Sequence, residues 1–192
     1  PIFAGTSNGA MMSAYRRAVA GLFMVAVLVL GCSYTAGKSV NESLTSDESM
    51  NRTLEHLEES LAALPAGGRL DRVHPELPVG DLGYGGFAPC YDSNTVVEGP
   101  EYFGVGFWVV DGGDGPAGLK SVVERWTEWG WTGDDRAPDG DRYAQRTSPD
   151  EYTLTAQLST SGYLSLSGSS PCFPFENGTD LDAQGPGVIE QP

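Results

Sequence analysis

The stretch RYAQRTSPDEYTLTAQLSTSGYLSLS, from Arg142 to Ser167, decides the fold. It divides into three strand-like segments, Arg142–Thr147, Tyr152–Ser159 and Tyr163–Ser167, which are joined by the hairpin-length connections SPDE and STSG. In the middle segment apolar and polar side chains alternate, which is typical of a strand with one buried and one solvated face. The stretch therefore predicts an antiparallel β-meander.

Two amphipathic helices are predicted upstream of the meander. The first starts at Asp47, capped by Ser46 or by Asp47 itself, and stops before Pro65. The second covers residues 116–130 and ends at Gly130. Each carries apolar side chains at spacings of three and four residues, which place them on one helix face. These side chains are Met50, Leu54, Leu57, Leu61 and Leu64 in the first helix, and Leu119, Val122, Val123, Trp126 and Trp129 in the second.

Between the two helices lies the apolar segment YFGVGFWVV (102–110), which predicts a buried strand. The order along the chain is then helix, loop, strand, helix and antiparallel meander. This order predicts an α+β fold, a two-layer sandwich in which the helices pack on one face of the sheet, within a single domain over residues 47–173. The polar segment 174–192 is expected to be a disordered tail.

The first 31 residues have the organisation of a signal peptide. Arg16 and Arg17 precede an apolar run of 13 residues, Ala18–Leu30, which is too short for a membrane-spanning helix. The ten residues before Met11 do not resemble the start of a signal and are interpreted as an artefactual extension. Residues 1–31 are therefore predicted to direct export of the chain.

The sequence VLGC (29–32) resembles the lipobox of bacterial lipoproteins. The resemblance implies cleavage after Gly31 and attachment of a diacylglyceryl group to the thiol of Cys32. The protein would then be anchored to the cell membrane on its extracytoplasmic face, with residues 32–46 as a lipidated flexible tether. The alternative is an ordinary secretory signal or an uncleaved signal anchor, with Cys32 incidental.

Lipid attachment at Cys32 would leave Cys90 and Cys172 as a pair. In an exported protein the oxidising environment favours a disulfide between them. A zinc site is disfavoured because neither cysteine has a nearby histidine or second cysteine, and a redox pair typically forms a local CxxC motif.

The order of these features resembles that of the small LppA-like lipoproteins of actinobacteria. The shared pattern is a lipobox cysteine, a helix, a mid-chain cysteine, a strand and a helix, followed here by YTLTAQLSTSGYLSLSGSSPC (152–172). The resemblance implies envelope anchoring and the fold, and it implies no catalytic residues.

The chain is strongly acidic, with 26 acidic and 11 basic side chains and a formal net charge of −15. Such a surface repels nucleic acid and anionic lipid headgroups, because binding to both relies on lysine and arginine. Nucleic acid is therefore excluded as a partner, and the membrane is expected to be reached through the covalent lipid at Cys32.

No catalytic motif or cofactor signature is recognisable. His56, on the polar side of the first helix, and His74, in a loop, are both predicted to lie at the surface. The segment GDLGYGG (80–86) does not lead into a helix and so predicts a loop rather than a phosphate site. The acidic side chains of 134–141 do not match an EF-hand, and turn formation and a loose calcium site both stay open. These are Asp134, Asp135, Asp139 and Asp141.

The four tryptophans are the most suggestive side chains. Clustered aromatic residues build a core, or they line a groove that contacts a ligand. The four are Trp108, Trp126, Trp129 and Trp131.

Three functions are considered on this basis. The first is a non-enzymatic binding or accessory role in the cell envelope, with an envelope protein or a small ligand as partner. The second is a carrier of a lipid or sugar, which requires an apolar pocket between the helix 116–130 and the sheet. The third is an envelope glycan hydrolase, which requires two carboxylates about 5–10 Å apart in a cleft.

Overall fold

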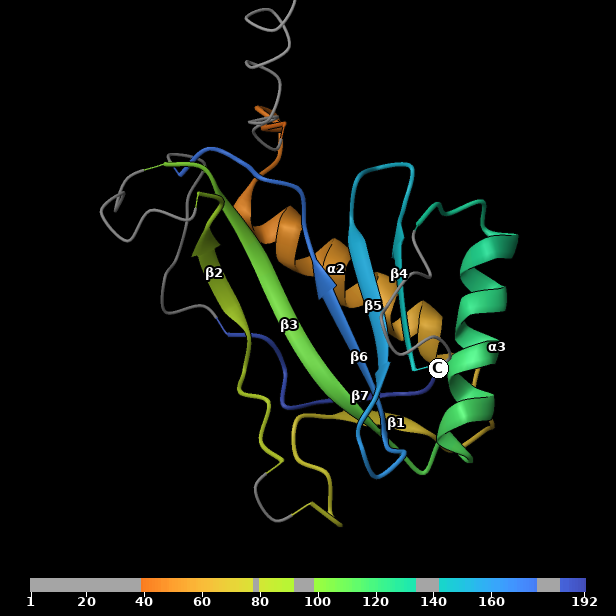
Figure 1. Ribbon diagram of the computed structural model, residues 1–192. Coiled ribbons are helices and arrows are strands. Elements are labelled where there is room, and N and C mark those ends of the chain that lie inside the picture. Colours follow the sequence, from red (N-terminus) through yellow and green to blue (C-terminus); the bar gives the residue numbers. More distant parts are fainter. Residues whose placement is uncertain (1–38, 78–79, 92–98, 134–141, 176–183) are drawn as a thin grey trace, which may run out of the picture. The chain divides into compact units, whose positions relative to one another are not determined.

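The meander is present in the computed structural model, which describes residues 39–77, 80–91, 99–133, 142–175 and 184–192 (Figure 1). Its three strands pair antiparallel in sequence order, and they are β4 (Tyr143–Thr147), β5 (Thr153–Leu158) and β6 (Leu164–Ser169). On β5 the apolar side chains Leu154, Ala156 and Leu158 are buried, and the polar side chains between them face the other way. The alternation read from the sequence is thus confirmed.

β3 (Glu101–Val110) is the long central strand of the sheet. One of its edges pairs with β6, and the other edge is shared by two short strands, β1 (Arg69–Asp71) and β2 (Gly86–Pro89). β7 (Val188–Glu190) then pairs with β1, and every named pairing is antiparallel. The described strands therefore form one seven-stranded sheet in the order β4-β5-β6-β3-β1-β7, with β2 beside β3.

Both helices pack on the same face of this sheet. In Figure 1, α2 (Ser46–Leu61) crosses behind the strands, and α3 (Gly115–Glu128) stands at the right of the sheet. β6 contacts both: a Cβ atom on Gly168 would lie 2.8 Å from the methyl group of Thr53 on α2, and one on Gly118 of α3 would lie 3.1 Å from Leu164. The predicted α+β two-layer sandwich is confirmed.

The buried face of α2 differs from the predicted leucine stripe. Leu57 and Leu61 are fully buried, but Met50 and Leu54 are only half-buried. Three small hydroxyl side chains of α2 are also buried, and each donates to a backbone carbonyl of its own helix, which satisfies its hydroxyl proton away from water. The bonds are Ser49 Oγ to Ser46 O (2.7 Å), Thr53 Oγ1 to Ser49 O (2.7 Å) and Ser60 Oγ to His56 O (2.6 Å).

The start of α2 is one or two residues earlier than predicted. Thr45 is the N-cap, not Ser46 or Asp47. Its side chain accepts from the backbone amide of Glu48, whose carboxylate in turn accepts from the amide of Thr45, which makes a capping box. Gly130 follows the end of α3 with a φ of 76°, as the sequence predicts, whereas the N-cap, Asp114, is not predicted.

The ordered domain is longer at both ends than the predicted range 47–173. The predicted tether is wrong from Ser39 onward, because Val40 forms a parallel bridge to Cys172 and the amide of Asn41 donates to its carbonyl (2.8 Å). The predicted disordered tail is wrong for residues 184–192, which contain β7. Residues 176–183, like 1–38, lie outside the described ranges.

The side chain of Gln191 holds the C-terminal segment against the end of α2. The side-chain amide of Gln191 donates to Leu61 O (3.3 Å) and Leu64 O (3.1 Å), which are carbonyls at and beyond the end of α2. Its own oxygen accepts from the amide of Gly67 (2.9 Å). Carbonyls at a helix end lack partners within the helix, so this side chain supplies bonds that the helix needs.

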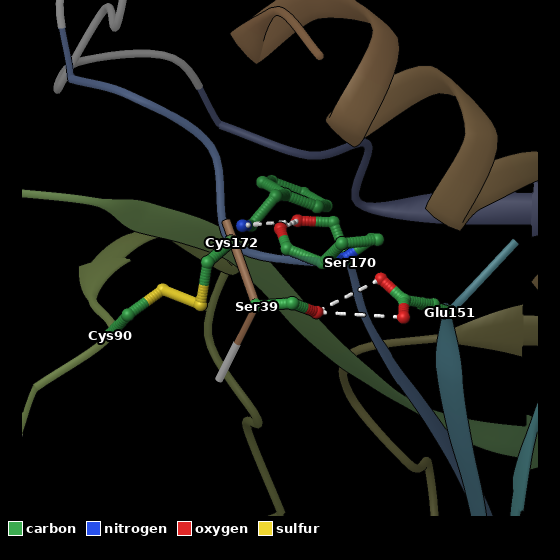
Figure 2. Close-up of a disulfide and its surroundings, with 7 residues drawn as sticks. Ser39, Cys90, Glu151, Ser170 and Cys172 are labelled. Carbon is green, nitrogen blue, oxygen red and sulfur yellow. Dashed lines mark hydrogen bonds between the residues drawn. A yellow bond between two sulfur atoms is a disulfide. The ribbon is translucent and has the colours of Figure 1, made fainter. Parts of the chain in front are cut away.

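The expected pairing of Cys90 with Cys172 is present as a disulfide (Figure 2). It joins the end of β2 to the segment after β6, across 82 residues of sequence. Figure 2 also shows Ser39 beside this bond, where its hydroxyl donates to a carboxylate oxygen of Glu151 (3.3 Å). The disulfide therefore lies where the entering chain, β2 and the end of the meander meet.

Candidate functional site

His56 is buried, contrary to its predicted place on the surface. It lies on α2 with 3% of its side chain exposed, and its ring packs edge-on against Trp131 (centroids 4.9 Å apart) and Tyr152 (5.3 Å). Its two ring nitrogens make no hydrogen bond. A carboxylate oxygen lies near each nitrogen without forming a hydrogen bond, with Glu59 Oε2 3.4 Å from Nδ1 and Asp150 Oδ2 3.6 Å from Nε2.

Asp150 is held in place by the turn between β4 and β5. Ser148 Oγ donates to its Oδ1 (2.5 Å), and Arg52 Nε donates to its Oδ2 (3.3 Å). Partial burial alone would raise the pKa of Asp150, but the bonds from Ser148, from its own backbone amide and from Arg52, together with nearby His56, hold this pKa below its usual value. The carboxyl is therefore an anion beside His56 at neutral pH.

Three of the tryptophans gather at the end of α3. Trp126 is fully buried, and its indole Nε1 donates to Ser60 Oγ on α2 (2.8 Å). Trp131 stacks on Trp126, with centroids 6.1 Å apart and planes 16° from parallel, and Trp129 leans against Trp131 at 5.3 Å. The turn at Gly130 brings this about, because it folds the chain back so that the Trp131 amide donates to Trp126 O (3.0 Å).

A groove of about 470 Å³ opens beside these rings, and we refer to it as the α2/α3 groove. It lies between the two helices rather than between α3 and the sheet, where the carrier hypothesis placed a pocket. Its volume is in the range typical of small-ligand sites. The groove is lined by Arg52, His56, Glu59, Ala62, Arg125, Trp129, Trp131 and Pro192.

Trp108 does not belong to this cluster. It lies on β3 with the side chains that face away from the helices, and its indole Nε1 donates to the carbonyl of Gly80. His74, which is 7% exposed and therefore also buried, packs between Trp108 (6.1 Å) and Tyr163 (4.3 Å). The predicted groove of four tryptophans is thus wrong for Trp108. Trp126 is a core residue, so only Trp129 and Trp131 of the four line the groove.

A second hollow, of about 360 Å³, lies beside His74. It is bounded by the turn after β3 (Asp111–Asp114) and by the β5–β6 hairpin. Two of its lining side chains are hydrogen-bonded to each other, because the hydroxyl of Tyr163 donates to Glu76 Oε2 (2.5 Å). The α2/α3 groove, which is lined by a buried imidazole that makes no hydrogen bond, is the stronger candidate for a binding site.

The acidic segment predicted as a turn or loose calcium site, Asp134–Asp141, lies outside the described residues. In the ranges that are described, no three histidine, cysteine, aspartate or glutamate side chains converge as metal ligands would. Neither described helix has the length and apolar character needed to cross a membrane.

One pH effect follows from the packing around His56. Burial raises the pKa of the neighbouring Tyr152 to about 12 from 10.0, with a further contribution from the charge of Asp150. Between these two values the folded state keeps the phenol of Tyr152 protonated, whereas the unfolded chain ionises it. The contribution of this group to the free energy of unfolding is fully present below about pH 10 and is lost as the pH rises through about 12.

Urea unfolding of the wild type and of Tyr152→Phe at a series of alkaline pH values measures this effect. By pH 12 the free energy of unfolding of the wild type should have fallen by roughly 2–3 kcal/mol more than that of the variant. Tyr84→Phe, which changes an exposed tyrosine, is the control. Parallel pH profiles for the wild type and Tyr152→Phe would contradict the assignment.

No protein-family model matches the chain, and a search of curated proteins finds no significant match.

Proposed function

We propose that this protein is an exported, lipid-anchored binding protein of the cell envelope, whose folded domain acts by binding rather than by catalysis. The observation that carries the proposal is the Cys90–Cys172 disulfide. Disulfides persist on the oxidising side of the membrane and are rare in the cytosol. The bond uses two of the three cysteines and leaves Cys32, which follows the signal-like sequence, for lipid.

The N-terminal sequence supports the anchor. Arg16 and Arg17, the apolar run Ala18–Leu30 and the lipobox-like VLGC occur in the order that lipid attachment requires. The resemblance to LppA-like lipoproteins agrees with this order and stays a prediction.

A binding role is supported by the α2/α3 groove. Half-buried Trp129 lines it, together with the side chains of Arg52, Glu59 and Arg125. Small-ligand sites combine aromatic walls with a few polar groups in this way. The observation favours a small ligand over an envelope protein as the partner, and it makes the carrier hypothesis the second candidate function.

Labelling of cells with an alkyne fatty acid tests the anchor. The wild type should carry the label, and its mature N-terminus should be acylated Cys32 by mass spectrometry. Cys32→Ser should lose the label completely, because no other thiol stands at the lipobox position. Cys172→Ser is the matched control: it removes a cysteine and the disulfide but should keep the label. A labelled Cys32→Ser protein, or a wild type whose mature chain starts elsewhere, would refute the anchor.

A further inference from the structure

We infer that the α2/α3 groove binds a neutral pyranose unit of a glycan, an inference that rests on the proposed binding function. Three properties of the groove support this inference: a buried imidazole that makes no hydrogen bond, a half-buried indole, and lining arginines whose charges are offset by neighbouring carboxylates.

His56 is the first of these. Its side chain lines the groove and is 97% buried, and neither nitrogen makes a hydrogen bond, although Glu59 Oε2 lies 3.4 Å from Nδ1 and Asp150 Oδ2 lies 3.6 Å from Nε2. A buried polar group without a partner is costly, and native structures contain few of them. An imidazole nitrogen either donates or accepts, whereas a hydroxyl group does both, so a ligand hydroxyl that takes the place of the Glu59 carboxylate beside Nδ1 is able to bond this nitrogen.

Trp129 is the second. It is the C-cap of α3, and its ring is half-buried, whereas Trp126 and Trp131 are almost completely covered by one another and by the core. Trp129 therefore offers the groove an aromatic surface against which the C–H face of a sugar ring can lie. The nearby ring of Trp131, at 5.3 Å, keeps Trp129 in place.

The charges of the lining are the third. Arg52 pairs with Glu55 (2.6 Å) and Asp150 (3.3 Å), and Arg125 pairs with Glu128 (3.5 Å), so the positive charge of each arginine is offset. Such a site neither attracts an anion such as phosphate strongly nor suits the acyl chain of a lipid, because the charged groups would lose water without gaining partners.

Sugar hydroxyls fit the same lining. Each hydroxyl both donates and accepts, whereas arginine only donates and a carboxylate only accepts. Arg52 and Glu59 lie on one face of α2 on either side of His56, and so present donor and acceptor groups along the groove. The volume of about 470 Å³ is sufficient for a small ligand.

Binding of defined trisaccharides to the full chain tests the inference. The probes are maltotriose, cellotriose, mannotriose and chitotriose, with inorganic phosphate and laurate as comparison ligands, followed by tryptophan fluorescence and by saturation-transfer NMR. At least one trisaccharide should bind saturably. Trp129→Ala should weaken that binding roughly tenfold, and Glu59→Gln, a change at an exposed side chain that preserves shape, should weaken it as well. Trp108→Ala, on the opposite face of the sheet, is the matched control and should bind like the wild type.

The outcomes separate this inference from the proposed function. If phosphate or laurate binds at Trp129 and no trisaccharide binds, the inference of a sugar ligand is wrong, but the proposed binding function stands. Trisaccharide binding that is insensitive to Trp129→Ala and Glu59→Gln overturns the site. Absence of binding by every probe overturns the inference, while fatty-acid labelling of Cys32 is unaffected by it and tests the anchor separately.

Discussion

Replacing Cys90 and Cys172 together with serine is expected to lower the free energy of unfolding by about 4.5 kcal/mol, the chain-entropy cost of releasing a loop of this length. The bond closes 82 residues of sequence, a span that includes β3, α3 and the whole meander. Without it the unfolded chain gains conformations, whereas most native contacts remain. In a domain of this size the melting temperature should fall by roughly 10–15 °C.

The comparison is best made in a Cys32→Ser chain, so that Cys90 and Cys172 are the only thiols. A reducing agent should lower the melting temperature of the disulfide-containing protein to that of the double variant and should leave the double variant unchanged. Amide exchange at Asn41, whose N–H donates to Cys172 O, should accelerate. Equal melting temperatures with and without reductant would show that the bond does not stabilise the fold.

The second large effect is expected from Trp126→Ala, with a loss of about 3–5 kcal/mol. Trp126 is fully buried between α2 and α3, so truncation leaves a cavity and removes the ring on which Trp131 stacks. The indole also donates to Ser60 Oγ, which in turn donates to His56 O, and this chain of bonds joins the two helices. Urea unfolding measures the loss.

Two variants serve as controls for Trp126→Ala. Trp129→Ala, three residues away and half-buried, should cost much less, since the groove is already open beside it. Ser60→Ala leaves the buried indole N–H without its partner and should cost about 1–3 kcal/mol. If Trp126→Ala and Trp129→Ala were equally destabilising, the division between a core tryptophan and a groove tryptophan would be wrong.

Periodicity was sufficient to predict the main elements of the fold. β5 alternates strictly, β3 is rich in β-forming residues apart from Gly104 and Gly106, and Gly130 follows the end of α3, so local patterns specify each of them. β1, β2 and β7 were not predictable in the same way. Each has only three or four residues in a Gly- and Pro-rich context, and each exists because β3, or β1 already paired to it, offers a free edge.

The candidate site was predicted only in part. The sequence singles out Trp129 and Trp131, but it does not predict the burial of His56, because the leucine stripe of α2 places His56 on the solvent side. The buried face of α2 is wider than the leucine stripe, since Ser49, Thr53 and Ser60 are also buried with their hydroxyls bonded back to the helix. The spacing of Arg52, His56 and Glu59 on one helix face was a signal for the groove, but tertiary packing was needed to show what lies opposite.

The parallel bridge between Val40 and Cys172 has a mechanical consequence under the proposal that the protein is anchored at Cys32. A pulling force on the N-terminal segment meets this bridge and the Asn41–Cys172 hydrogen bond before it meets the first turn of α2. From Cys172 the load divides, through the disulfide to Cys90 and β2, and through the paired backbones of Phe173 and Glu101 to β3. Tension is thus delivered to the centre of the sheet, and α2, which forms one wall of the groove, is shielded from it.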